Sequence, residues 1–569
     1  MQKKRFFGFL CAMVTGCVLL LTCESIPVVS APPLSQKDVT WNSDLPSAIF
    51  PAAADKVDVI VYREGVGLGT TITSLMAIVN AEQPRIAIDS DNRLYVFNRL
   101  GIKYNAIYDP YILFSKYSSY ITKAVIWDEA VPDTLNLACT YAGLNGAVVL
   151  TRSDYNALGK RGISPDVIAD YRGQFSRTAS ESEQRLAVYG FLYDNYYEYC
   201  THRIITSQSP YNIKLRDYSM AVGSAIIFLS FNGAEGELAN KFFSRAEAGN
   251  SAVLGWAPDG DEGGLVNAAS LNGMYVWAAD HSQSLTLFAA DAGQTPVLPV
   301  KSVAEFLAQG RVRPAVYVAI GVSDGDNLQY MQGAMFDKFG DQMHRNPRMP
   351  ALSWTINPAA SEVIPVVYNY FIQAQANDFP QDGFLTGPSG IGYFYPYRMY
   401  GTARQNDMLA FFGQTSRYLA KTGINTISVW YRGVGDPEVS DDFLRDVAPR
   451  LPGVSAMLFQ RKDTPRGRGG VLFSGWDDPY NDNFRENFER QIKGAFDRFA
   501  SDGRRAEYVS LQAVPWDGQM FQHLLEVRET SDSLTSGSVK GGDVIKYVTI
   551  DQLVQLQRIE MGLAPINRN

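Results

Sequence analysis

Histidine and charged residues are scarce in this 569-residue chain. Only four histidines occur, which leaves little room for a histidine-built metal site or a histidine-dependent hydrolase. Charged residues make up 19% of the chain, and 51 Lys+Arg against 59 Asp+Glu give a net charge of −8. A nucleic-acid partner is not expected, because binding phosphates needs a basic face. We also predict no cofactor.

Cysteine is nearly absent from the folded part of the chain. Three of the five cysteines fall within the first 31 residues, which leaves only Cys139 and Cys200. Two cysteines this far apart cannot form a disulfide framework or a CxxC metal site. A single bridge in an oxidising compartment is one interpretation. Two buried free thiols are the interpretation that we favour.

The first 31 residues have the pattern of a secretory signal. Basic residues at positions 3–5 precede an apolar run over 6–21, which is typical of such signals. This run is short and interrupted, which favours a signal over a membrane anchor. Cleavage after Ala31 competes with lipoprotein-type processing at Cys17 or Cys23. We therefore expect an exported protein that is periplasmic, extracellular or held at the cell envelope by a lipid anchor. Attachment to a membrane is expected only through a lipidated N-terminus.

No internal repeat is visible, and strand-like and helix-like segments alternate up to about residue 310. They include an expected helix over 70–80 and a hairpin over 85–98. This alternation predicts small α/β or α+β modules. We place them at 32–110, 111–215 and 216–300, followed by one larger domain over 310–560.

The larger domain has a regular pattern of strands separated by helical segments. Seven strands are expected, at 315–320, 352–356, 383–386, 424–430, 454–459, 470–473 and 508–514. Such a series over about 250 residues predicts an α/β fold of the (β/α) TIM-barrel type or an incomplete variant. A doubly wound open sheet is the alternative.

Aromatic residues are abundant, with 31 Tyr, 30 Phe and 8 Trp. Four of the tryptophans fall at or just after predicted strand ends, where barrel enzymes carry their sites: Trp354, Trp430, Trp476 and Trp516. Aromatic rings cover the apolar faces of sugars, while carboxylates and amides bind the hydroxyls. The alternative is that these rings close the end of a barrel core.

Carboxylates stand beside several of these strand ends. Glycoside hydrolysis needs two carboxyl groups across the scissile bond, and the candidates are Asp324, Asp326, Asp436, Asp477 and Asp478. The segment Ser-Asp-Gly-Asp-Asn at 323–327 is the best placed, since it directly follows a buried strand. A solvated turn is one alternative. A structural calcium ion is another, although the 12-residue calcium loop is not matched.

The sequence Gly-Ile-Gly-Tyr-Phe-Tyr-Pro at 390–396 matches in full the motif of the GxGYxYP family of putative glycoside hydrolases. The acidic segment at 323–327 and the segments 253–256 and 259–264 also resemble that family. The resemblance covers most of residues 50–560. It implies small N-terminal modules before a barrel-like domain, and a carbohydrate substrate.

The motif itself suggests a local structure. Gly390 and Gly392 permit a close approach of backbone or ligand. In an extended chain Tyr393 and Tyr395 point to the same side, which predicts a wall of two tyrosines beside the barrel mouth. A packed hairpin that supports the barrel end is the alternative.

Together these features predict an exported glycoside hydrolase, with a non-catalytic glycan-binding protein as the alternative. Asp324 and Asp326 are the leading catalytic carboxylates, and Asp477 or Asp478 is expected to supply the opposing group. The expected substrate-binding residues are Asn327, Trp354, Tyr393, Tyr395, Trp430, Arg432 and Trp476, with Arg432 on an acidic or hydroxyl-rich substituent.

Overall fold

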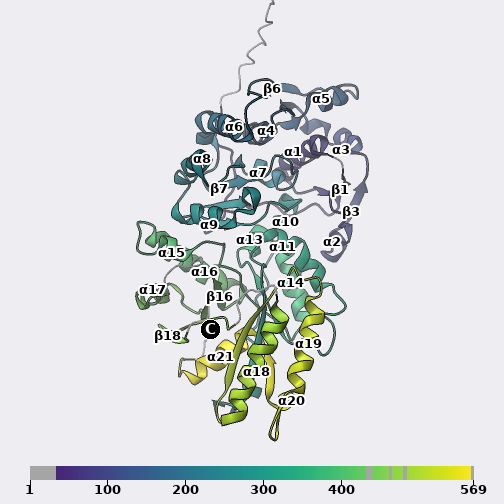
Figure 1. The fold of residues 1–569 in the computed structure, drawn as a ribbon. Coiled ribbons are helices and arrows are strands. Elements are labelled where there is room, and N and C mark those ends of the chain that lie inside the picture. The colour runs from purple at the N-terminus through teal and green to yellow at the C-terminus, as the bar shows by residue number, and fades with distance from the viewer. Residues whose placement is uncertain (1–33, 64, 431–438, 461–463, 478–482, 565–569) are drawn as a thin grey trace, which may run out of the picture.

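The computed structural model describes residues 34–63, 65–430, 439–460, 464–477 and 483–564. The predicted signal lies outside these residues. The molecule consists of an N-terminal half with three small sheets and a C-terminal half with one large sheet, stacked end to end (Figure 1). Within the described ranges, no helix has both the length and the apolar character needed to cross a membrane.

The N-terminal half contains three separate parallel sheets. The first has the order β2-β1-β3, the second β5-β4-β6 and the third β10-β9-β7-β8. Their strands are β1 (Val57–Val61), β2 (Ile86–Asp89), β3 (Tyr104–Ile107), β4 (Lys123–Ile126), β5 (Val148–Leu150), β6 (Asp166–Asp170), β7 (Ile204–Ser207), β8 (Ala225–Ile227), β9 (Ala252–Gly255) and β10 (Tyr275–Trp277). The third sheet begins at β7, so the predicted division at 215/216 falls inside it.

Helices connect these parallel strands, as the alternation predicted. They are α1 (Val66–Glu82), α2 (Leu94–Arg99), α3 (Pro110–Lys116), α4 (Thr134–Asn145), α5 (Arg152–Gly159), α6 (Glu181–Asn195), α7 (Arg216–Ala221), α8 (Gly233–Ser244), α9 (Glu262–Leu271) and α10 (Leu285–Phe288). Cys139 and Cys200 are buried free thiols, as the favoured interpretation predicted.

The predicted hairpin over 85–98 is wrong. β2 pairs in parallel with β1, and the chain then turns into α2. The carboxylate of Asp89 accepts hydrogen bonds from the backbone N–H groups of Asp91 (3.2 Å) and Arg93 (2.8 Å). These bonds fold the polar segment into a helix entry instead of a tight strand-to-strand turn.

The C-terminal half is built on one nine-stranded sheet. Eight strands follow the order β18-β19-β17-β16-β15-β14-β13-β20, β23 also pairs with β13, and only the β18–β19 pair is antiparallel. All seven predicted strands are present. The strands are β13 (Val316–Val322), β14 (Leu352–Ile356), β15 (Gly383–Thr386), β16 (Thr426–Val429), β17 (Ala456–Phe459), β18 (Arg466–Arg468), β19 (Val471–Gly475), β20 (Glu507–Ala513) and β23 (Ile545–Val548).

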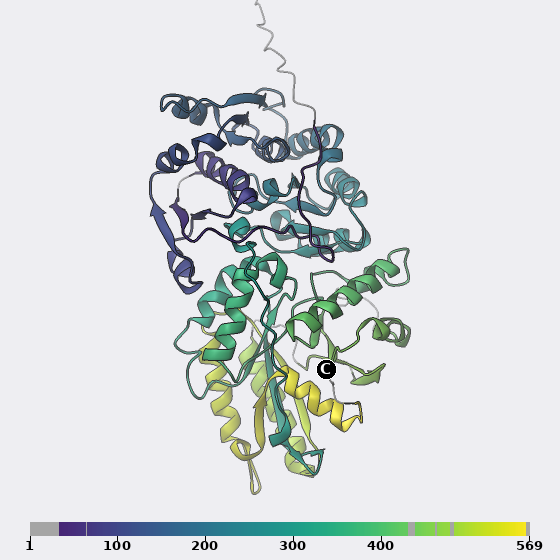
Figure 2. The same ribbon diagram turned by 180° about the vertical axis from the view of Figure 1, so that it is seen from behind.

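Helices pack against both faces of this sheet. Those between the strands are α11 (Leu328–Gln332), α12 (Ala334–Phe339), α13 (Ala360–Val363), α14 (Pro365–Asp378), α15 (Pro396–Met399), α16 (Gln405–Thr422), α17 (Asp441–Val447), α18 (Phe484–Asp502) and α19 (Met520–Ser533), and α20 (Gly541–Val544) precedes β23. The last helix, α21 (Ile550–Glu560), lies against the concave face of the sheet (Figure 2). Its buried Leu553 and Val554 pack with Ala319 of β13 and Leu458 of β17.

The sheet is curled, so that its two ends approach each other. The backbone N–H of Asp477, just after β19, donates to the carbonyl oxygen of Ser510 on β20 at 2.9 Å. Among the described residues no ladder pairs β19 with β20. The predicted α/β class is thus confirmed, and its C-terminal part is a curled, mostly parallel sheet.

Candidate functional site

A cavity of about 360 Å³ lies at the carboxyl ends of the C-terminal strands, against the N-terminal half. This is the edge where parallel α/β sheets usually bind ligands. Both halves of the molecule contribute to its wall. The lining residues are Trp256, Glu262 and Ala278 from the N-terminal half, and Ser323, Asp324, Asp326, Asn327, Gln329, Pro388, Tyr393, Trp430, Gln512 and Trp516 from the C-terminal half.

The acidic segment after β13 enters this cavity on a fixed turn. β13 is buried along its whole length, and the chain then turns at Asp324 with φ of 70°. The backbone N–H of Gly325 donates to the Thr355 hydroxyl at 2.8 Å. A Cβ at Gly325 would lie 1.6 Å from the Thr355 carbonyl oxygen, so only glycine fits there. The turn is therefore clamped on β14, and Asp324, Asp326 and Asn327 all line the cavity.

Asp326 is the more buried of the two carboxyl groups, with 7% of the residue exposed. Burial raises its pKa well above the usual range, and the nearby charges of Asp324 and Glu262 raise it further. Its Cβ packs on Gly387, where an added Cβ would approach it to 2.3 Å. Such a setting favours the protonated form of the carboxyl group, which can donate its proton.

Asp324 differs from Asp326 in its hydrogen bonding. Burial raises the pKa of Asp324 as well, but the indole N–H of Trp516 donates to its Oδ2 at 2.5 Å and opposes that rise. A donor to a carboxylate favours the ionised form. Burial thus raises the pKa of both carboxyl groups, and the indole donor opposes that rise at Asp324.

Glu262 is a third carboxyl group in the cavity, and it was not among the predicted site residues. It begins α9 in the N-terminal half, and its Oε1 accepts a hydrogen bond from the Tyr393 hydroxyl at 2.7 Å. Its charge raises the pKa values of both Asp324 and Asp326. The sequence did contain a signal, because Glu262 lies within the segment 259–264 that resembles the family.

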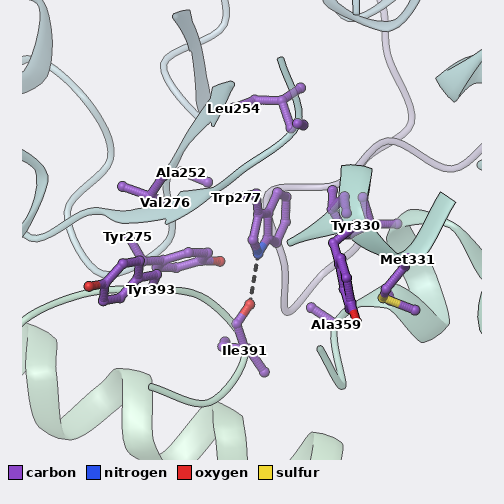
Figure 3. Close-up of a cluster of buried hydrophobic side chains, with 14 of the residues drawn as sticks. Ala252, Leu254, Tyr275, Val276, Trp277, Tyr330, Met331, Ala359, Ile391 and Tyr393 are labelled. Carbon is purple, nitrogen blue, oxygen red and sulfur yellow. Dashed lines mark hydrogen bonds between the residues drawn. The ribbon is translucent and has the colours of Figure 1, made fainter. Parts of the chain in front are cut away.

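The motif at 390–396 joins the two halves of the molecule. Tyr393 and Val276 of β10 exchange backbone hydrogen bonds of 3.0 and 2.8 Å. The indole N–H of Trp277 donates to the carbonyl oxygen of Ile391 at 2.7 Å (Figure 3). A Cβ at Gly392 would lie 2.3 Å from the ring of Tyr275. The predicted close approach at Gly392 is thus to the protein's own third sheet.

The two motif tyrosines lie side by side, as predicted, but they do not form an open wall. Their ring centroids are 5.6 Å apart and their hydroxyl oxygens 3.4 Å apart. Tyr393 is only 4% exposed and Tyr395 9%. Tyr393 lines the cavity, whereas the backbone N–H of Tyr395 donates to Ser270 at 2.9 Å. The structure therefore places Tyr395 in support of the site, outside the cavity wall.

The four predicted tryptophans divide into two pairs. Trp430 and Trp516 line the cavity, and Trp516 is 57% exposed. Trp354 and Trp476 are fully buried. The indole of Trp354 donates to Asp382 at 2.9 Å, and the ring of Trp476 lies against Gly321 inside the curled sheet. A buried ring cannot stack on a sugar, so the expectation that these two act as platforms is corrected.

Of the remaining predicted residues, only Asp477 lies in the described part of the chain, and it does not line this cavity. The carboxylate of Asp477 accepts hydrogen bonds from the backbone N–H (2.8 Å) and hydroxyl (3.1 Å) of Ser510, so it helps to hold the ends of the sheet together. Asp478, Arg432 and Asp436 lie outside the described residues. Within those residues no group of three or more His, Cys, Asp or Glu side chains is arranged to hold a metal ion.

Fold and site define a multidomain α/β protein with a carboxylate-lined cavity where a curled parallel sheet meets N-terminal modules. The chain belongs to the GxGYxYP family. Three models of that family match it: the "GxGYxYP putative glycoside hydrolase C-terminal domain" over residues 315–558, the "GxGYxYP_N second domain" over 121–200 and the "GxGYxYP third domain" over 202–290. The family is thus one described as putative glycoside hydrolases.

A solved structure has the same fold. It is titled as a putative hydrolase from Bacteroides thetaiotaomicron, and it is 18% identical with a TM-score of 0.71 over 94% of this chain and 99% of its own. The match to an α,α-trehalose 6-phosphate synthase from Burkholderia multivorans covers 78% of this chain and 93% of that one at 12% identity, but its TM-score of 0.16 is too low to indicate a shared fold. No curated protein matches the chain.

Proposed function

We propose that this protein is an exported glycoside hydrolase that cleaves an oligo- or polysaccharide in the cavity between its two halves. The observation that carries the proposal is the meeting of Asp324, Asp326 and Glu262 with Trp430 and Trp516 around one cavity. Carboxyl groups beside aromatic rings suit a ligand with a rim of hydroxyls and apolar faces. Membership of the family supports the same reaction class.

Asp326 is the proposed proton donor to the glycosidic oxygen. Its burial and its raised pKa support this role, because a general acid must hold its proton at the working pH. Asp324, which accepts the Trp516 indole N–H, is proposed to remain ionised and to stabilise positive charge at the anomeric carbon. Trp430 and Trp516 would contact the sugar faces, and Asn327 its hydroxyls.

We also propose that the C-terminal sheet is an incomplete (β/α) barrel. Seven of its strands are parallel, follow one another around the curl and carry the cavity at their carboxyl ends, which is the arrangement of barrel enzymes. Export rests on the N-terminal sequence pattern alone. Detection of a processed N-terminus in the envelope or culture medium, by mass spectrometry, tests it.

Reducing-sugar release across a panel of polysaccharides tests the activity. We expect the wild type to release sugar from at least one of them, and Asp326→Asn to lose about 10²–10⁴-fold in rate, the usual contribution of a general acid. An unchanged rate in Asp326→Asn removes Asp326 from catalysis. Binding to a glycan without cleavage by the wild type would favour the alternative, a glycan-binding protein.

A further inference from the structure

Glu262 reaches the cavity from a different half of the molecule than the Asp324–Asp326 pair. It is the first residue of α9, it lines the same cavity, and its charge acts on both aspartates. Asp477 is tied to Ser510 instead. We propose that Glu262 is the second catalytic carboxylate, opposite the acid Asp326, and that the active site is complete only when the N-terminal modules are docked.

Tyr393 of the family motif is the positioning residue for Glu262. Its hydroxyl donates to the Glu262 carboxylate at 2.7 Å, and its backbone pairs with Val276 in the third sheet. The same residue therefore docks the third sheet and orients the carboxylate that this part of the chain delivers. This gives the motif a chemical reason to carry tyrosine at position 393, since phenylalanine would keep the packing and lose the hydrogen bond.

The proposed reaction, which rests on the proposed glycosidase function, is a hydrolysis in which water displaces the leaving sugar. Asp326 gives its proton to the glycosidic oxygen as the bond from that oxygen to the anomeric carbon breaks. A water oxygen bonds to the anomeric carbon, and the proton that water loses goes to the Glu262 carboxylate. The products are a free sugar hydroxyl and a hemiacetal. Exchange with solvent returns Asp326 to its protonated and Glu262 to its ionised form.

The site around Glu262 is dominated by acidic and phenolic groups. Asp324 and Asp326 face it from the turn after β13, and Tyr393 and Tyr395 from the motif. Asp261 precedes it in the chain, and Arg398 acts on the neighbouring Tyr395. None of the described side chains that line the cavity is basic. The Tyr393 hydroxyl donates a hydrogen bond to the Glu262 carboxylate, and replacing Tyr393 by phenylalanine removes this donor while keeping the ring.

The first test compares Glu262→Gln with Asp259→Asn, a control that removes an exposed carboxylate from the same segment outside the cavity. On a glycan cleaved by the wild type, Glu262→Gln should lose about 10²–10⁴-fold in kcat, and Asp259→Asn should keep the wild-type rate. Glu262→Ala should regain at least tenfold on addition of azide, with a glycosyl azide as product. A merely structural glutamate would show no such rescue.

The second test compares kcat and KM in Tyr393→Phe, with Tyr400→Phe as the control. The Tyr400 hydroxyl also bonds a carboxylate, that of Asp446 at 3.0 Å, away from the cavity. Without the hydrogen bond from Tyr393 the Glu262 carboxylate is no longer held in one orientation, so kcat should fall by about 10–10²-fold with KM nearly unchanged in Tyr393→Phe, and neither constant should change in Tyr400→Phe. A Tyr393→Phe variant with the wild-type kcat overturns the positioning role of Tyr393.

The two proposals fail in different ways. If the wild type cleaves no glycan, the glycosidase function itself is wrong. If the wild type is active and Asp326→Asn is not, while Glu262→Gln keeps its rate within about threefold, the function stands and the role of Glu262 is overturned. Loss of rate in Glu262→Ala without azide rescue and with a lowered melting temperature also overturns it, in favour of a structural role.

Discussion

Replacing Gly392 by alanine should weaken the contact between the two halves of the molecule. The added Cβ would lie 2.3, 3.0 and 3.1 Å from three ring atoms of Tyr275, whereas carbon atoms in contact prefer about 3.5–4.0 Å. Tyr275 cannot yield easily, because it is fully buried and its ring packs on those of Trp277 (5.5 Å) and Phe411 (5.1 Å). The motif segment must therefore move away from β10.

The loss of unfolding free energy that this movement causes can be worked out from the contacts that it disturbs. Overpacking a core position costs about 1–3 kcal/mol. The shift also strains the two backbone hydrogen bonds between Val276 and Tyr393 and the bond from Trp277 to Ile391, each worth about 1 kcal/mol. We expect Gly392→Ala to lose about 2–5 kcal/mol of unfolding free energy, measured as the shift in the urea midpoint.

Gly413→Ala is the matched control, and it should raise the unfolding free energy where Gly392→Ala lowers it. Gly413 lies within α16, and an added Cβ there meets nothing within 4 Å. Alanine in a helix interior is favoured over glycine by about 0.5–1 kcal/mol, so this variant should unfold at a slightly higher urea concentration. A Gly392→Ala variant as stable as the wild type would refute the reasoning that the motif glycine exists for this contact.

Three further predictions follow from the site and the core. Burial raises the pKa of Asp326, so the stability that this group contributes is present below its unfolded pKa near 4 and is lost as pH rises through the folded pKa. Asp326→Asn should therefore have a higher melting temperature than the wild type at pH 8, and the difference should shrink toward pH 4. A difference in melting temperature that does not depend on pH would contradict this. Trp354→Phe should lower the melting temperature and leave KM unchanged, because Trp354 is buried against Asp382. Trp516→Ala, at a 57% exposed position, should instead raise KM with little effect on the melting temperature. The reverse pattern would show that Trp354 belongs to the substrate-binding site. Dithiothreitol should leave the melting temperature of the folded chain unchanged, because Cys139 and Cys200 are free, and a drop of several degrees would reveal a disulfide.

Much of the C-terminal fold could be predicted from the sequence, because its strands are short apolar runs separated by amphipathic helices. α18 and α14, for example, repeat apolar residues at helical spacing. The additional strand β23 was missed, since Lys546 and Tyr547 break its apolar run. The inner position of α21 was missed as well, because nothing local tells a helix which face of a sheet it will cover.

The site was predictable only where it follows one strand. Asp324, Asp326 and Asn327 share a loop, so their proximity is local. Trp354 misled because it lies in the middle of β14, two residues before the end of the strand, and not at the strand end itself. Its ring is therefore buried in a sheet that is covered on both faces, as parallel sheets are. Glu262 stands more than 60 positions before Asp324 in the chain, and only the docking of the third sheet brings it to the cavity.

The most direct test of the whole account is a time course of product release from one defined oligosaccharide, with the wild type, Asp326→Asn, Glu262→Gln and Asp259→Asn side by side. We expect cleavage by the wild type and Asp259→Asn, and binding without appreciable cleavage by Asp326→Asn and Glu262→Gln. Cleavage by Asp326→Asn at the wild-type rate would contradict a site built on this carboxylate.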